Sequence, residues 1–143
     1  MIIRKGRESD LYNVLNIEVM AYEKPYWNQN MLLEVLVNKT DKRLWIYEVN
    51  NDVVGFIIDM RHKDEISLLN IAIHKCLQGM GHGLKMLKKY INSLSDKYSI
   101  YLEVNKNNIK ALNMYTKLNF ERISIRKSYS TEGGDAINMQ LVK

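Results

Sequence analysis

The six residues Gln78-Gly79-Met80-Gly81-His82-Gly83 form a Q-x-x-G-x-G stretch near the middle of the chain. An apolar run from Ile66 to Ile73 precedes this stretch, and apolar residues at helical spacing follow it from Leu84 to Leu94. The order predicts a strand, a glycine-rich turn and a helix N-terminus. Backbone N–H groups in such a turn converge on a phosphate, and the helix dipole favours the same negative charge. The stretch therefore predicts a site for a phosphorylated cofactor.

Two common phosphate-binding motifs do not fit this loop. A Walker A loop needs G-x-x-x-x-G-K-[ST], and neither Gly-Lys-Ser nor Gly-Lys-Thr follows here. A dinucleotide fingerprint needs G-x-G-x-x-G, but after Gly79 and Gly81 the third glycine, Gly83, comes too early. Neither motif therefore explains the loop, and a glycine-rich turn without a ligand is the alternative to a phosphate site.

Composition limits the class of protein. The 143 residues, 46% hydrophobic and 26% charged, fit one soluble globular domain spanning residues 1–143. The single cysteine, Cys76, excludes an internal disulfide and fits a reducing cytoplasm, and no apolar run is long enough to span a bilayer. The net charge of +5 comes from scattered Lys and Arg, which favours a phosphorylated cofactor over nucleic acid. We expect a cytoplasmic monomer or homodimer with neither a nucleic-acid nor a membrane partner.

The predicted elements follow the order β-α-α-β-β-β-α-β-α-β-β. Strands and helices that follow one another in this order predict an α/β (α+β) fold, namely a three-layer α-β-α sandwich with a mixed central sheet. Glu8-Ser9-Asp10 supplies capping chemistry for the first helix, Asn28 and Asn108 are expected helix N-caps, and Asn119 is an expected left-handed C-cap. The predicted strands are 2–3, 44–49, 53–60, 66–73, 99–104, 121–129 and 136–142, and the predicted helices are 11–22, 28–36, 84–94 and 107–118.

Two further stretches match a known pattern together with the glycine loop. Residues 102–108, Leu-Glu-Val-Asn-Lys-Asn-Asn, lead to Ala111-Leu112-Asn113-Met114-Tyr115 and then Leu118-Asn119-Phe120. This segment resembles the L-E-V-x-x-x-N…A-x-x-L-Y-x-x-x-G-F segment of the GNAT family of N-acetyltransferases, whose pyrophosphate loop the glycine stretch also resembles. The strand 69–73 and the stretches 125–129 and 135–139 resemble one subfamily, the ribosomal-protein-alanine N-acetyltransferases. The resemblance spans almost the whole chain.

The resemblance implies a transfer of acetyl from acetyl-CoA (CoA) to a primary amine. This reaction needs a neutral amine, a stabilised oxyanion and a proton for the departing thiolate. Glu103 is the implied general base, direct or through a water, at a strand end where burial is expected to raise its pKa. Tyr115 is the implied general acid. The alternative for Glu103 is a solvated carboxylate at a strand end, and the alternative for Tyr115 is a tyrosine of the core.

The resemblance also implies a set of cofactor-binding residues. Backbone groups of Ile71 and Ile73, on either side of Ala72, are implied to bind the pantetheine arm. The N–H groups of the glycine loop are implied to bind the pyrophosphate. Asn108 is implied to contact the cofactor as well as to cap a helix. The complete set is Ile71, Ala72, Ile73, Gln78, Gly79, Met80, Gly81, His82, Gly83, Leu84 and Asn108.

The acceptor side departs from the family pattern. Tyr26, Trp27 and Tyr129 are predicted to line the acceptor groove, with aromatic core packing as the alternative for each. Pro25-Tyr26-Trp27 is shifted against the usual P-W pair, and the last hairpin keeps only Tyr129 of the family's tyrosine pair and proline. The expected acceptor is the N-terminal α-amine of a protein such as a ribosomal protein. A lysine side chain, a polyamine or another small amine is the alternative acceptor.

A non-catalytic acyl-CoA-binding or partner-binding module is an alternative from another class of protein. The presence of both Glu103 and Tyr115 argues against it. His62, His74 and His82 lack a metal-ligand spacing such as H-E-x-x-H, so no metal is expected.

Overall fold

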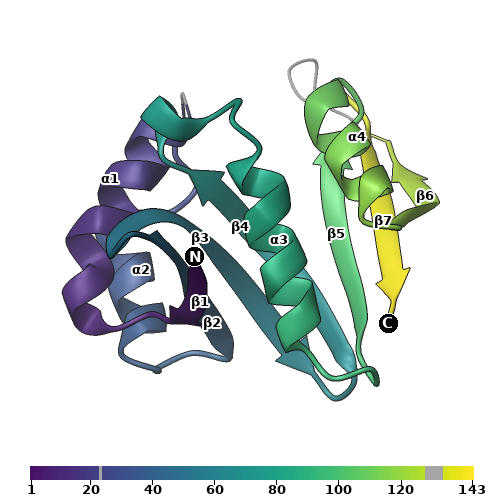
Figure 1. Ribbon diagram of the computed structural model, residues 1–143. Coiled ribbons are helices and arrows are strands. Elements are labelled where there is room, and N and C mark those ends of the chain that lie inside the picture. The colour runs from purple at the N-terminus through teal and green to yellow at the C-terminus, as the bar shows by residue number, and fades with distance from the viewer. Residues whose placement is uncertain (23, 128–133) are drawn as a thin grey trace.

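The computed structural model describes residues 1–22, 24–127 and 134–143, and these form a seven-stranded sheet between helices (Figure 1). The strand order is β1-β2-β3-β4-β5-β7-β6, and every neighbouring pair is antiparallel except β4 and β5. This mixed sheet confirms the predicted fold class. The strands are β1 Ile2–Lys5, β2 Lys42–Val49, β3 Asp52–His62, β4 Glu65–Ile73, β5 Ser99–Asn105, β6 Glu121–Arg126 and β7 Ala136–Val142.

The helices cover both faces of the sheet. Helices α1 (Leu11–Ala21) and α2 (Gln29–Leu36) pack on one face, and α3 (His82–Ser93) and α4 (Ile109–Lys117) pack on the other. Side chains of β3 point alternately to the two faces of the sheet and so contribute to two separate cores. Phe56 and Ile58 pack under α1 and α2, while Ile57 packs under α3. Each such buried side chain stabilises the fold by about 1.5–3 kcal/mol. No helix in the described ranges is long and apolar enough to cross a membrane.

Asparagine residues begin and end helices as the sequence predicts. The side chains of Asn28 and Asn108 accept hydrogen bonds from the N–H groups of Met31 and Ala111, at 2.9 and 3.1 Å, and so cap α2 and α4. Asn119 follows α4 with a φ of +70°. All three predictions are confirmed.

The start of α1 differs from the prediction. Glu8–Asp10 forms a short 3-10 helix, η1, before α1 begins at Leu11. Asp10 does not cap α1 with its side chain. Its carboxylate instead accepts from the backbone N–H of Arg7 and from the guanidinium of Arg4. Asp10 therefore forms an ion pair with Arg4 of β1, and its side chain does not cap α1.

The sheet opens between β4 and β5. The two strands pair only through Glu65–Ser67 of β4, and beyond that point they diverge (Figure 1). Asp59 of β3 pairs with Leu68 and Ile58 pairs with Asn70, so Leu69 is an extra residue in β4. Such a bulge bends its strand and increases the local twist. The bulge therefore accounts for the turn of β4 away from β5, which leaves the second half of β4 free on that side.

Candidate active site

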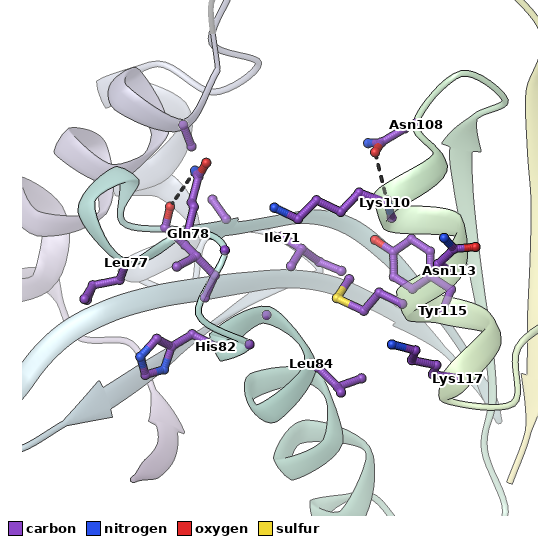
Figure 2. A pocket seen from close by; sticks show the side chains of 18 of the residues that line it. Ile71, Leu77, Gln78, His82, Leu84, Asn108, Lys110, Asn113, Tyr115 and Lys117 are labelled. Atoms are coloured by element: carbon purple, nitrogen blue, oxygen red, sulfur yellow. Dashed lines mark hydrogen bonds between the residues drawn. The ribbon is translucent and has the colours of Figure 1, made fainter.

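A cavity of about 540 Å³ lies where β4 and β5 diverge, between the glycine loop and α4 (Figure 2). One wall is the second half of β4, and the opposite wall is one side of α4. Most of the residues predicted for the cofactor line it: Ile71, Ala72, Ile73, Gln78, Gly79, Gly81, His82, Gly83, Leu84 and Asn108. Met80 was predicted with them but does not line the cavity, and its side chain is 64% exposed.

The glycine loop has the geometry of an anion site. Gly79 and Gly81 have φ values of +81° and +83°, a region that glycine adopts without strain. Gly81 is the N-cap of α3, whose first N–H groups have no partner within the helix and carry the positive end of the dipole. The side-chain amide of Gln78 donates to the carbonyl of Ile73 at 3.1 Å, which ties the loop to the end of β4.

Helix α4 adds cationic and polar side chains that the sequence analysis missed. Lys110, Asn113 and Lys117 line the cavity and lie three and four residues apart, so they share one side of the helix. Lys110 extends across the cavity toward Gln78 (Figure 2), and Lys117 lines the same cavity. The helical spacing of these residues, beside the net positive charge, was the signal that could have found them. Two ammonium groups and a glycine loop together fit a polyphosphate.

Tyr115 lies on the α4 wall of the same cavity. Its ring is buried and packs edge-to-face against Phe120, with centroids 5.7 Å apart. Burial raises the pKa of Tyr115 to about 12, because the phenolate would lose its hydration. At neutral pH the hydroxyl therefore keeps its proton and can donate it, as a general acid must.

Glu103 lies on the other face of the sheet and does not line the cavity. Its neighbours along β5, Leu102 and Val104, belong to the core under α3 and α4, so alternation points Glu103 the opposite way. Its carboxylate accepts two hydrogen bonds from Arg126, at 2.6 and 2.9 Å, and its side chain is 41% exposed. This arginine lowers the pKa of Glu103. The prediction that burial raises this pKa is wrong, because Arg126 outweighs the modest burial.

Of the predicted acceptor residues, the structure describes Tyr26 and Trp27, and neither of them lines the cavity. Tyr26 is 70% exposed and packs its ring edge against Tyr22, with centroids 5.1 Å apart. Trp27 is half-buried against the core under α1 and α2. Tyr129 lies outside the described residues, so its predicted role is untested.

Tyr22 itself lines the cavity and was missed by the sequence analysis. Its hydroxyl donates to the carbonyl of Ile71 at 2.5 Å, and burial raises its pKa. The carbonyls of Ile71 and Ile73, both predicted to face the pantetheine arm, thus accept side-chain hydrogen bonds from Tyr22 and Gln78. Each carbonyl oxygen has a second lone pair, so these bonds leave room for a ligand donor.

Comparisons with known proteins agree with this geometry. A model of the acetyltransferase (GNAT) domain matches residues 15–143. The chain is 40% identical over 131 residues to the ribosomal protein bS18-alanine N-acetyltransferase of Haemophilus influenzae, covering 90% of this chain and 86% of that protein. The Haemophilus ducreyi enzyme of the same name is 31% identical over 125 residues, covering 85% of this chain and 83% of that protein.

A solved structure gives the same result for the fold. The ribosomal-protein-S18-alanine N-acetyltransferase of Escherichia coli superposes with a TM-score of 0.84 at 28% identity, covering 98% of this chain and 92% of that chain. GNAT acetyltransferases as a family use acetyl-CoA as the acyl donor. With a family model over most of its length and relatives above 30% identity, the chain belongs to the GNAT family of N-acetyltransferases.

Proposed function

We propose that this protein acetylates the N-terminal α-amine of a protein, and that an alanine-starting ribosomal protein bS18 is its acceptor. The observation that carries the proposal is the cavity at the β4–β5 divergence, which combines a phosphate-type glycine loop with a protonated Tyr115. The acceptor comes from the relatives, since two of them that match over 85% and 90% of this chain are named for bS18 alanine. Single-domain organisation over residues 1–143 is part of the proposal.

The cavity residues fit acetyl-CoA, which when bound supplies the acetyl group as an activated thioester. The N–H groups of Gly81 and Gly83 at the start of α3 bind the diphosphate, and Lys110 and Lys117 neutralise phosphate charge from the opposite wall. The half of β4 that does not pair with β5, around Ile71 and Ile73, orients the pantetheine arm. Asn108, already a helix cap, lies at the rim on the α4 side (Figure 2).

Glu103 and Tyr115 act from opposite faces of β5. Tyr115 holds a proton at its phenolic oxygen in the cavity and gives it to the departing sulfur. Glu103 is ionised at neutral pH, so it attracts the acceptor amine and takes its proton, directly or through a water. The cavity at the β4–β5 divergence is lined by Tyr22 from the α1 side of the sheet as well as by α4, so it reaches toward both faces. The acceptor therefore approaches from the Glu103 face, where Tyr26 and Trp27 of the loop after α1 line its path.

Tandem mass spectrometry on one peptide tests the acceptor. The peptide carries the N-terminal sequence of bS18, beginning with alanine, and one internal lysine. Incubation with acetyl-CoA and the protein is expected to place acetyl on the α-amine alone. The same peptide with a formylated N-terminus is the control and should remain unmodified. Acetyl on the lysine of either peptide would support the lysine alternative and contradict the proposal.

A further inference from the structure

Glu18, near the end of α1, is a fully buried carboxylate with an exposed fraction of 0%. One of its oxygens, Oε2, accepts from the backbone N–H groups of Tyr26 and Trp27, at 2.8 and 3.0 Å. The other, Oε1, accepts from the side-chain amide of Asn70 at 2.8 Å. Among the described residues these partners are neutral N–H donors, so the charge is stabilised by hydrogen bonds and not by a cation.

The three donors belong to two segments that are far apart in the sequence. Tyr26 and Trp27 lie in residues 24–28, which we call the acceptor loop. Asn70 lies in the half of β4 that does not pair with β5. Glu18 thus connects the acceptor loop to the strand that forms one wall of the cavity.

The connection continues to the cavity itself. The side-chain oxygen of Asn70 accepts from the backbone N–H of Ile71 at 3.0 Å, and Ile71 lines the cavity. From the other side, the hydroxyl of Tyr22, just before the acceptor loop, donates to the carbonyl of Ile71. The backbone N–H and the backbone carbonyl of Ile71 are therefore both bonded to side chains that lead back to α1 and its following loop.

We infer that Glu18 and Asn70 are positioning residues, which hold the acceptor loop at a fixed place relative to the acyl-donor strand. This inference rests on the proposed function in one respect, the assignment of Tyr26 and Trp27 to the acceptor path. Neither Glu18 nor Asn70 lines the cavity, so neither contacts the donor there. Loss of the Glu18 carboxylate should displace the acceptor while donor binding is preserved, and a displacement of about 1 Å is enough to reduce a rate about a hundredfold.

Glu18→Gln breaks the connection with the least change in shape. An amide at position 18 places an N–H₂ group against either the two backbone N–H groups or the Asn70 amide, so donor faces donor. In the folded variant, the KM for the bS18 N-terminal peptide should rise at least about tenfold, while the KM for acetyl-CoA stays within about twofold of the wild-type value. Glu34→Gln, the same change on the exposed side of α2, is the matched control and should leave both KM values unchanged.

The double variant Glu18→Gln plus Asn70→Asp tests the hydrogen bond itself. The new amide then donates to the new carboxylate, and its oxygen accepts from Tyr26 and Trp27. The carboxylate at position 70 also still accepts from the N–H of Ile71, and the buried charge is unchanged. Recovery of the acceptor KM in the double variant supports the inference. A folded Glu18→Gln variant with unchanged acceptor KM, or a folded double variant that fails to recover it, would overturn the inference.

Two further experiments cover the cases in which Glu18→Gln does not fold or the bS18 peptide is not the acceptor. If Glu18→Gln does not fold, Asn70→Ala cuts the same connection and leaves Glu18 its two loop donors, and the same rise in acceptor KM is expected. If the wild-type protein does not acetylate the bS18 peptide but does acetylate spermidine or a lysine peptide, the proposed acceptor is wrong. The same KM comparison with that other acceptor then decides the role of Glu18. A wild-type protein that acetylates none of them contradicts both proposals.

Discussion

Glu103 of β5 and Arg126 of β6 form a two-point ion pair across β7, with nitrogen–oxygen distances of 2.6 and 2.9 Å. Asn138 of β7 pairs with Glu103 on one side and with Ser124 on the other, which brings the two charged side chains to the same face. The pair lies on the face of β5 opposite Tyr115. The carboxylate proposed as the base is therefore ionised and held in place before an acceptor arrives.

Arg126→Gln should move the acidic limb of the pH–rate profile. Arg126 holds the pKa of Glu103 below its ordinary value, so protonation of the base is delayed to lower pH. Without the arginine the pKa rises toward the ordinary value, and the acidic limb of kcat/KM for the acceptor shifts to higher pH. Arg122→Gln on the same strand is the control. An acidic limb that does not move would show that Glu103 is not the titrating group.

Tyr115→Phe should lower kcat by about 10²–10⁴-fold, the usual contribution of a general acid. The ring that packs against Phe120 is retained, so the fold and the KM for acetyl-CoA should change little. Steady-state rates with both substrates varied give the two parameters separately. Tyr12→Phe, at an exposed position of α1, is the matched control. A Tyr115→Phe enzyme with more than about a tenth of the wild-type kcat would exclude Tyr115 as the acid.

Gly81→Ala should weaken donor binding. The φ of +83° at this position costs a residue with a side chain about 1–2 kcal/mol, so the loop is expected to relax and misplace its N–H groups. We expect the KM for acetyl-CoA to rise about fivefold or more, with a small loss of thermal stability. Gly134→Ala also introduces a side chain at positive φ, +63°, but outside the glycine loop. It should lose stability and keep its donor KM, and equal donor KM values for the two variants would contradict the account.

Lys110→Gln should reduce donor affinity in a salt-dependent way. The lysine extends across the cavity from α4, so its contribution to phosphate binding is electrostatic and partly screened. Isothermal titration with coenzyme A is expected to show a loss of several-fold at about 50 mM salt and a smaller loss at about 500 mM. Lys88→Gln on the exposed side of α3 is the control. A loss that is the same at both salt concentrations would assign Lys110 a structural role.

Local features of this fold could be predicted from the sequence because they depend on nearby residues. The caps at Asn28 and Asn108 use hydrogen bonds that span only three residues, and the strand before the glycine loop is marked by its apolar run. Most of the residues placed by such local rules, namely 71–73, 78–79 and 81–84, fall together around the cavity. Helix α3 nevertheless begins at His82 and not at Leu84, because Gly81 already serves as the N-cap.

The features that the sequence did not reveal depend on distant segments. The extra residue Leu69 in β4 is visible only from its pairing with β3, so the divergence from β5 could not be placed. The bond between Glu103 and Arg126 needs the register of three strands, and its effect on the pKa reverses the expectation from burial. Glu18 meets Asn70 across 52 residues, and only the packing of α1 on β4 brings them together.

Thiol release from acetyl-CoA tests the proposed reaction and its proposed acceptor in one experiment. The wild-type protein and the double variant Glu103→Gln plus Tyr115→Phe are compared with the bS18 N-terminal peptide, its N-formylated form, a lysine peptide and spermidine as acceptors. Rapid release is expected only with the free N-terminal peptide, and this release should be lost in a double variant that still binds coenzyme A. Undiminished release by the double variant, or no release by the wild-type protein with any acceptor, would contradict the proposed reaction.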